Sequence, residues 1–376
     1  MSTAVQKVLI IGGGFSGMAA AICLSRQGIG VDLVEIDPQW QVAGAGLTMG
    51  GASLRAIEDL GLLDEFLHYG SVVDSTQVFT PDDQLIATMP TPILTRKQVP
   101  GNGAIMRADL ARIMERAVRA AGGVDIRLGC TFTNIKQDAE GVEVCFTDDS
   151  TRRYDLVVGA DGVFSKVRQA VFPQAPKPAY SGQSVWRAML TRPAEVTSTR
   201  LWTDQHTKVG INPVNREKMY LFVNEFRPVH EFLEPSTFLP TLKDLLKPFS
   251  APMVQWIRSQ LSIDSQILFR PLEGMLMPQP WYEGRVVLMG DAVHATTPHL
   301  GSGACIGIED GIVLAQELTT GPLNAALQRY STRRWERCRM VVENSARLGE
   351  IEKKGGDKQE HARIMRESFI ALAQAI

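Results

Sequence analysis

A glycine-rich turn near the amino terminus, at residues 12–17, is the feature that most constrains the fold. An apolar run at 8–11 precedes it, and an apolar stretch with helical spacing follows at 18–27. A second apolar run at 31–35 completes the pattern. Short apolar runs bounded by glycines indicate buried strands, so the segment predicts a strand, a tight turn, a helix and a second strand. This order is typical of the first β-α-β unit of a Rossmann-like domain.

The turn fits the spacing GxGxxG, in which each glycine has a separate task. Gly12 permits the tight turn, Gly14 lets a pyrophosphate approach the backbone, and Gly17 lets the helix pack against the strand. Glu35 ends the second strand, where a carboxylate can bind the hydroxyls of an adenosine ribose and would repel the 2′-phosphate of NADP. We therefore expect a bound dinucleotide other than NADP; the alternative is a purely structural glycine turn.

The composition excludes several classes of function. The formal net charge is −2 at pH 7, so no basic excess favours nucleic-acid binding. No stretch approaches the roughly 18 apolar residues of a membrane-spanning helix, and the apolar run at 8–11 is too short for a secretion signal. The five cysteines include no pair at CxxC spacing, which argues against a disulfide framework or a metal site. We expect a cytoplasmic protein without a structural metal.

The 376 residues exceed what a single core usually holds and indicate two modest domains. Alternating apolar and polar residues at 181–226 predict strands, and a proline-rich stretch at 173–178 marks the crossing into that region. We expect an α/β fold in which a mostly-β substrate domain is inserted into a Rossmann-like domain. The expected parts are a dinucleotide-binding domain at 1–175 and 265–324, a substrate-binding β-sheet domain at 176–264, and C-terminal helices at 325–376.

Two further turns follow short apolar runs. The first reads Gly-Ala-Asp-Gly, contains Asp161 and follows a run at 156–159. The second reads Gly-Asp, contains Asp291 and follows a run at 286–289; Pro298 and two glycines come shortly after it. Each turn places a carboxylate directly after an apolar run that predicts a buried strand.

With these three motifs in this order, the chain resembles the group A flavoprotein aromatic hydroxylases, the family of p-hydroxybenzoate hydroxylase and salicylate hydroxylase. The match covers about residues 5–345. The resemblance implies a Rossmann-like FAD-binding domain, with Asp291 at the ribityl or pyrophosphate part of FAD and Arg107 at the flavin. It links Asp161 to FAD and NAD(P)H handling, although a structural turn is an equal alternative. Arg107 could also be an ordinary first residue of a helix.

The loop at 298–303 has a physical interpretation of its own. Its glycines would let the backbone approach the isoalloxazine ring, and a helix starting near Ala304 would direct its positive end at the negative charge of reduced flavin. The family usually has glutamine where this chain has Ser302, a departure that bears on substrate contacts. The residues assigned to the cofactor are Gly12, Gly14, Phe15, Ser16, Gly17, Glu35, Ala45, Gly46, Arg107, Asp161, Asp291, Pro298, Gly301, Ser302, Gly303 and Ala304.

In the family that the chain resembles, NAD(P)H reduces the flavin and a flavin hydroperoxide transfers one oxygen atom to an electron-rich ring. The resemblance therefore implies NADH or NADPH as a transient reductant and dioxygen as co-substrate. It also implies a small phenolic acid, hydroxypyridine or purine-like substrate, which we expect between the 298–303 loop and residues 181–226. The candidate catalytic residues are His206, Tyr220 and His299. The alternatives are a surface histidine and a merely packed tyrosine.

Other functions stay open at this level. A flavin oxidase or dehydrogenase shares the first turn, and a tetracycline-inactivating monooxygenase would apply the same chemistry to a larger substrate. A flavin-dependent halogenase is disfavoured, because its Trp-x-Trp-x-Ile stretch is missing after Trp186. A binding module without enzymatic activity predicts a colourless protein. We expect a monomer or a homodimer.

Overall fold

A six-stranded sheet forms the core of the first unit of the computed structural model, which describes residues 5–41, 44–91 and 99–376. Its strand order is β18-β19-β12-β1-β2-β8, and neighbours are parallel except for the edge pair β18–β19. Parallel strands are buried on both faces, which explains the continuous apolar run in β1. The strands are β1 (Lys7–Ile11), β2 (Gly30–Glu35), β8 (Val124–Leu128), β12 (Leu156–Gly159), β18 (Tyr282–Glu283) and β19 (Val286–Leu288).

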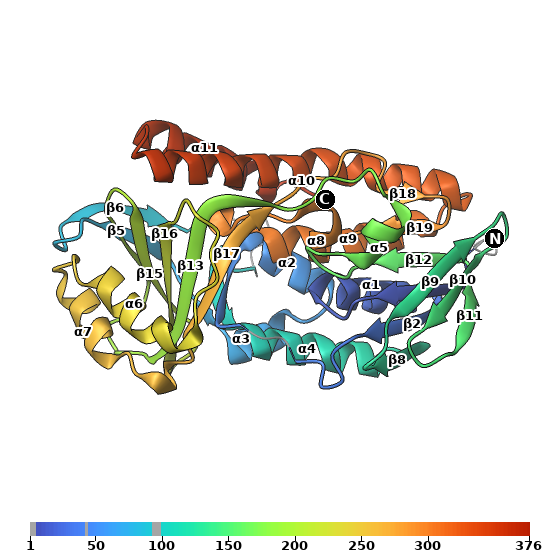
Figure 1. The fold of residues 1–376 in the computed structure, drawn as a ribbon, viewed down its shortest axis with the longest axis horizontal. Coiled ribbons are helices and arrows are strands. Elements are labelled where there is room, and N and C mark those ends of the chain that lie inside the picture. Colours follow the sequence, from blue (N-terminus) through green and yellow to red (C-terminus); the bar gives the residue numbers. More distant parts are fainter. Residues whose placement is uncertain (1–4, 42–43, 92–98) are drawn as a thin grey trace.

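Helices α1 (Phe15–Arg26) and α4 (Arg107–Ala120) pack on this sheet, and α9 (Gly303–Leu318) packs on α1 (Figure 1). α1 and α9 cross closely at small residues. If Gly311 had a side chain, its first carbon would lie only 2.5 Å from the backbone nitrogen of Ala20. The predicted Rossmann-like FAD-binding fold is confirmed. Shorter helices of this unit are α2 (Gly51–Asp59), α3 (Leu63–Tyr69), α5 (Lys166–Val171) and α8 (Asp291–His294).

A seven-stranded sheet in the order β17-β13-β16-β15-β14-β5-β6 forms the second unit. Strands from the predicted substrate region are β13 (Ala179–Thr191), β14 (Thr199–Thr203), β15 (Thr207–Pro213) and β16 (Lys218–Phe226). Strands from outside residues 176–264 also join it: β5 (Ser75–Phe79), β6 (Leu85–Pro90) and β17 (Leu268–Gly274). The sheet is larger than the sequence pattern indicates, because pairing between distant segments leaves no local signal.

The two faces of this sheet differ in burial. One face, which includes Trp186, is fully buried in an apolar core against two helices, α6 (Phe238–Leu246) and α7 (Pro252–Gln260). The opposite face, called the inner face below, turns toward the first unit. It is less buried and carries Arg187, Met189, Tyr220 and Phe222.

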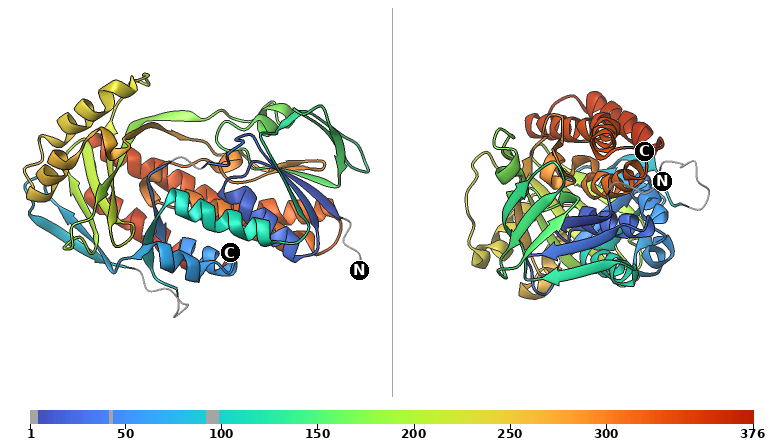
Figure 2. Two further views of the ribbon diagram at one scale, coloured as in Figure 1. Left: turned by 90° about the horizontal axis from the view of Figure 1, so that it is seen from below. Right: turned by 90° about the vertical axis from the view of Figure 1, so that its right-hand side faces the viewer.

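The C-terminal helices run past both units. Figure 1 shows α10 (Leu323–Lys354) and α11 (Lys358–Ala373) along the top of the molecule, and the end-on view in Figure 2 shows them on the same side. α10 packs on α9 and reaches β13 of the second unit. Among the described residues, no helix combines the length and the apolar character needed to cross a membrane.

Two small sheets complete the described structure. The first lies beside the inner face, in the order β3-β7-β4, and the second is β11-β10-β9. Their strands are β3 (Gly46–Gly50), β4 (Ser71–Val72), β7 (Asn102–Met106), β9 (Phe132–Gln137), β10 (Val142–Phe146) and β11 (Thr151–Tyr154). Short 3-10 turns are η1 (Pro235–Thr237), η2 (Ile263–Ser265) and η3 (Pro298–Leu300).

Candidate active site

The three turns predicted from the sequence meet at one edge of the parallel sheet. β1, β12 and β19 are neighbours, so their carboxyl ends lie side by side. The backbone N–H of Ala160 donates to the Ile11 carbonyl (2.8 Å), and that of Met289 donates to the Gly159 carbonyl (3.0 Å). A side chain at Gly12 would collide with the Ala160 carbonyl. All three turns therefore form the edge at which α/β sheets bind ligands.

Both carboxylate oxygens of Glu35 are held by the backbone of the glycine turn and its neighbours. The N–H of Gly13 donates to Oε2 (2.7 Å), and that of Asp37 donates to Oε1 (2.9 Å). Trp40, which carries no motif signal, donates its indole N–H to the Gly13 carbonyl (2.8 Å). A side-chain carbon at Gly14 would meet no described atom within 4 Å, and no side chain caps α1. The turn is thus held in place while the first N–H groups of α1 stay available to an anion.

The turn after β19 packs directly on the start of α1. A side chain at Gly290 or at Gly307 of α9 would collide with the Ser16 hydroxyl. Gly290 also has a φ of +60°, which disfavours any residue with a side chain. This close approach brings Asp291, the first residue of α8, to the amino-terminal end of α1, where its side chain is exposed. A carboxylate and free helix N–H groups therefore lie at the same edge.

Arg107 lies between these turns and the inner face. Its backbone N–H donates to the Ala45 carbonyl (2.9 Å), and its guanidinium lies 5.1 Å from the centre of the Phe15 ring. Its Nε is buried and has no hydrogen-bond partner among the described residues. Burial and the nearby Arg187 lower the pKa of Arg107, whereas Asp291 opposes them. A buried donor needs an acceptor, which a carbonyl-rich or anionic ligand would supply.

Asp161 has its hydrogen-bonding partners within the protein. Its carboxylate accepts from the Ser165 hydroxyl (2.5 Å) and from the backbone N–H of Lys166 (2.6 Å), so it caps α5. Arg168 of the same helix donates to the carbonyl oxygen of Ala292 (2.7 Å) and joins the second turn to the third. These contacts favour the structural interpretation of Asp161, and its contact with a cofactor stays a prediction.

The loop before α9 consists of η3, Gly301 and Ser302. Gly301 has a φ of +60°, and a side-chain carbon there would meet no described atom within 4 Å. Ser302 donates its hydroxyl to the carbonyl two residues earlier (2.9 Å), so no side chain caps α9 at Gly303. Ala304, in the first turn of α9, is half-buried. The amino-terminal end of α9 is therefore free to face a ligand.

Tyr220 connects the inner face to the first unit. Its ring covers β3 so closely that a side chain at Gly46 would collide with it. Its hydroxyl lies 2.6 Å from Thr48 Oγ1 and 3.1 Å from the side-chain nitrogen of Asn212, which also donates to Thr48 (2.8 Å). Thr48 has no motif signal, although residues 46 and 48 alternate onto one face of their strand. Tyr220 thus belongs to a polar triad at the junction of the two units.

The two candidate histidines lie away from this triad. His299 is buried, with Nδ1 2.9 Å from Thr297 Oγ1 and Nε2 3.5 Å from Glu352 Oε2 on α10. His206 is exposed in the hairpin before β15, and its ring contacts Phe226. His206 precedes Asn212, the triad residue on β15, by six positions, which span about 20 Å along an extended strand. Neither imidazole lies beside Tyr220, and their catalytic roles stay predictions.

Comparisons with known proteins decide the family. A family model described as FAD binding domain matches residues 5–345. The chain belongs to this FAD-binding family. It is 30% identical to the aurachin C monooxygenase/isomerase of Stigmatella aurantiaca, over 92% of this chain and 89% of the relative. It is 27% identical to an FAD-dependent urate hydroxylase of Klebsiella pneumoniae, over 90% of this chain and 88% of the relative. The crystal structure of Klebsiella pneumoniae HpxO complexed with FAD and uric acid has a TM-score of 0.83 at 24% identity, over 98% of this chain and 93% of that one.

Membership of the FAD-binding family confirms the predicted resemblance and the assignment as an FAD-dependent aromatic monooxygenase. The geometry fits FAD. The unpartnered Nε of Arg107 and the uncapped starts of α1 and α9 are the donors that a dinucleotide carrying a flavin needs. With FAD bound, we expect α1 to hold phosphate, Asp291 to hold the ribityl or pyrophosphate part, and Arg107 and α9 to face the flavin.

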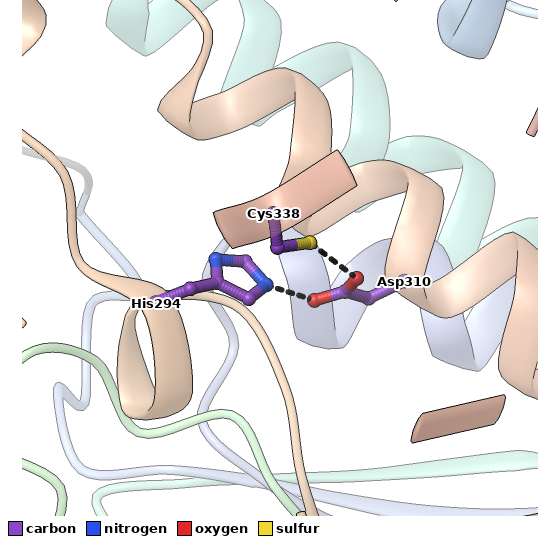
Figure 3. A group of neighbouring side chains, drawn as sticks. All are labelled: His294, Asp310 and Cys338. Atoms are coloured by element: carbon purple, nitrogen blue, oxygen red, sulfur yellow. Dashed lines mark hydrogen bonds and ion pairs between the residues drawn. The ribbon is translucent and has the colours of Figure 1, made fainter. Parts of the chain in front are cut away.

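A buried network supports the Gly290–Asp291 turn of the FAD site from behind. His294 Nε2 lies 2.6 Å from an Asp310 oxygen that also accepts from the Gly290 N–H (2.9 Å), and Figure 3 shows this pair beside Cys338. Arg334 donates to the other Asp310 oxygen (2.8 Å). Burial lowers the pKa of His294, but Cys338 and Asp310 outweigh it and hold the pKa well above 6.5. The Asp310 carboxylate therefore favours the protonated form of the His294 ring.

The ligand atoms of His294, Asp310 and Cys338 lie within 4.8 Å of one another, a spacing compatible with a metal ion. Arg334 already binds the Asp310 carboxylate and approaches the Cys338 sulfur at 3.5 Å. A metal cation would be repelled by this guanidinium, so the group is better described as a buried ion-pair network. The group has no local signal in the sequence, because His294 comes from α8, Asp310 from α9 and Cys338 from α10.

Proposed function

We propose that the protein is an NAD(P)H-dependent FAD monooxygenase that hydroxylates a small aromatic or heteroaromatic substrate between the 298–303 loop and the inner face. The proposed substrate classes are phenolic acids, hydroxypyridines and purine-like rings. The supporting observation is the composition of the inner face. It combines aromatic and apolar side chains with polar groups that lack hydrogen-bond partners among the described residues, and it lies opposite the proposed FAD site.

The inner face has the composition of a binding surface for a small ring. Arg187, Met189 and Phe222 are only half-buried there, whereas Trp186 on the opposite face of the same sheet is fully buried. Arg187 has no hydrogen bond or ion pair with the described residues, and the buried Oδ1 of Asn224 also lacks a partner. Apolar and aromatic lining with a few convergent polar groups is typical of small-molecule sites.

Tyr220 supplies an oriented polar group at this surface. A tyrosine hydroxyl both donates and accepts, and Thr48 and Asn212 hold this one in place. A hydroxyl or ring nitrogen of the substrate would meet a preorganised partner there. The positive charges of Arg187 and Arg107 favour a substrate with a carboxylate or an ionised ring oxygen. Bound FAD supplies the oxygen-activating chemistry, while these residues orient the ring and exclude water.

The relatives support the substrate class. One is named an FAD-dependent urate hydroxylase, and a structure of similar fold contains uric acid, a purine-like ring. NADH or NADPH is proposed as a reductant that binds only transiently, because the sequence has one GxGxxG turn in a β-α-β context and we assign this turn to FAD.

The test is a substrate screen with the FAD-loaded protein. Phenolic acids, hydroxypyridines and purines are added with NADH or NADPH, and both reductant consumption and product mass are measured. We expect at least one class to accelerate reductant oxidation and to yield a product heavier by one oxygen atom. Unaccelerated oxidation with hydrogen peroxide as the sole product from all three classes would contradict the proposal. If only a tetracycline-like compound is turned over, the proposed class of small aromatic substrates is wrong and a larger ring system takes its place.

A further inference from the structure

A second cluster of charged side chains joins three parts of the molecule at the far end of the inner face. Glu352 of α10 lies 2.5 Å from the Lys208 ammonium of β15, 3.1 Å from His361 Nε2 of α11, and 3.5 Å from His299 Nε2. Lys208 stands on the inner face, because it pairs with Asn224, which alternates onto that face of β16. His299 belongs to the 298–303 loop. One carboxylate therefore contacts both sides of the proposed reaction site.

The buried His299 ring lies between Thr297 and Glu352. Burial lowers the pKa of His299 to about 4, although Glu352 opposes this shift. The Thr297 hydroxyl lies 2.9 Å from Nδ1, and a neutral ring that accepts a hydrogen bond there carries its proton on Nε2. Nε2 has no hydrogen-bond partner among the described residues and faces the Glu352 carboxylate. In that tautomer, the Glu352 carboxylate is an acceptor 3.5 Å from the ring nitrogen that carries the proton.

Glu352 is ionised in this environment. Burial raises its pKa, but Lys208 and His361 outweigh burial and hold the pKa of Glu352 well below its ordinary range. The Lys208 side chain is only 18% exposed, so loss of the carboxylate would leave a largely buried ammonium without an anionic partner. The negative charge of Glu352, more than the size of its side chain, therefore holds α10 against Lys208 of the sheet and His299 of the loop.

α10 approaches the loop too closely for either to adjust easily. A side-chain carbon at Gly349 would lie 2.8 Å from Gln183 Oε1 and 3.0 Å from His299 Cε1. Leu300 of the loop also packs in an apolar cluster with residues of α10 and α11, namely Leu348, Ile351 and Ile364. The loop is therefore held by apolar contacts through Leu300 and by Glu352 through His299.

We propose that Glu352 is a positioning residue for the monooxygenase reaction, which fixes the 298–303 loop and the inner face relative to each other through His299 and Lys208. The loop leads directly into α9, whose amino-terminal end faces the proposed flavin position. A change at Glu352 therefore alters the surroundings of the flavin without touching it. The proposal rests on the proposed function for its catalytic readout, but its spectroscopic readout needs only bound FAD.

Three variants test this coupling. Glu352→Gln removes the charge and keeps the shape, Glu352→Asp keeps the charge, and Glu336→Gln at an exposed ion pair elsewhere on α10 is the control. Each FAD-loaded protein is compared with the wild type by visible absorbance, thermal unfolding and steady-state kinetics. We expect Glu352→Gln to shift the flavin absorbance bands and to lower kcat about tenfold, with the KM for the reductant within about twofold. Glu352→Asp should recover part of both effects, and Glu336→Gln should match the wild type.

An unchanged flavin spectrum and kcat in Glu352→Gln would overturn the proposal. Equal losses in Glu352→Gln and Glu352→Asp, with a much lower unfolding midpoint in both, would also overturn it in favour of a purely structural role. If Glu352→Gln does not fold, Lys208→Gln breaks the same ion pair from the sheet side, and an unchanged spectrum in that variant overturns the proposal. If no aromatic compound accelerates reductant oxidation, the proposed function fails while the spectral comparison still decides this inference.

Discussion

The two buried charge clusters differ in what they hold together. His294 and Asp310 belong to the first unit, Arg334 reaches them from α10, and all three are almost completely buried behind the Gly290–Asp291 turn. The cluster around Glu352 lies between the loop, the second sheet and the C-terminal helices. Its His299 ring is buried, but Lys208, Glu352 and His361 keep partial exposure. A fully buried network belongs to the folding core, whereas a half-buried junction can control how two parts of a site meet.

Two histidines five residues apart show the same difference. For His294, burial is outweighed by Cys338 and Asp310, and the pKa lies well above 6.5. For His299, burial prevails and lowers the pKa to about 4. The pKa values of the two rings are therefore shifted in opposite directions, because their surroundings and not their residue type decide the shift.

Breaking the first cluster should have the largest effect. Asp310→Asn removes the carboxylate that the His294 ring and the buried Arg334 guanidinium share, and breaking a buried ion pair in this way costs about 3–5 kcal/mol. We expect a much lower urea midpoint and loss of FAD on desalting, measured by denaturation and by flavin absorbance. Glu336→Gln, at the surface, should change neither. An Asp310→Asn variant that is as stable as the wild type and keeps FAD would show that the first cluster does not stabilise the folding core.

The crossing of α1 and α9 offers a test of the first unit without changing any charge. Gly311→Ala places a carbon 2.5 Å from the Ala20 nitrogen, and overpacking of this kind costs about 1–3 kcal/mol. We expect lower thermal stability and weaker FAD binding, because the glycine turn lies at the start of α1. Gly122→Ala is the matched control, since its added carbon would meet nothing within 4 Å. Equal behaviour of the two variants would disprove the close crossing.

The opposite pKa shifts of the two histidines predict opposite pH dependence. The unfolded His299 ring takes up a proton near pH 6.5 and the folded one near 4, so stability falls as the pH drops through this window. Between about pH 7 and about pH 5 the wild type should lose about 2 kcal/mol more than His299→Gln in urea denaturation. The contribution of His294 is present below 6.5 and is lost as the pH rises through its raised pKa. Parallel acid losses in wild type and His299→Gln would show that His299 is not a buried neutral ring.

The smallest effect is expected at the polar triad on the inner face. Tyr220→Phe keeps the ring over Gly46 but removes the hydroxyl shared with Thr48 and Asn212, a loss of about 0.5–1.5 kcal/mol in stability. We expect the KM for the aromatic substrate to rise while FAD binding is kept, as measured by steady-state kinetics. Tyr282→Phe, on the edge strand β18, should leave the KM unchanged. An unchanged KM in Tyr220→Phe would place the substrate elsewhere.

The first unit could be predicted because its signals are local. The glycine turn, the two apolar runs and the turns containing Asp161 and Asp291 each lie within a few residues, and the parallel sheet brings them together as its topology requires. The order of these motifs predicted a family of FAD-dependent enzymes, and this prediction is confirmed. The contacts of Asp161 show the limit of such motifs, since the same residue satisfies a helix cap.

The strands at 181–226 and the place of Tyr220 could be predicted from alternation, but the full second sheet and the cluster around Glu352 could not, because they depend on contacts between distant segments. β5 and β6 join the second sheet through pairing with β14, and Glu352 meets His299 only after α10 has crossed both units. His299 was expected near the substrate on the basis of its place after Pro298, but its ring turns toward α10. Side-chain direction in a loop is set by tertiary packing and leaves no pattern in the sequence.

The most direct test of FAD-dependent monooxygenation is mass spectrometry of the product formed under isotopically heavy dioxygen. The FAD-loaded protein receives NADH or NADPH and the aromatic compound that most accelerates reductant oxidation. We expect the product to contain one heavy oxygen atom, because the inserted atom comes from dioxygen. A product whose new oxygen comes from water, or an oxidised product without an added oxygen, would contradict monooxygenase function.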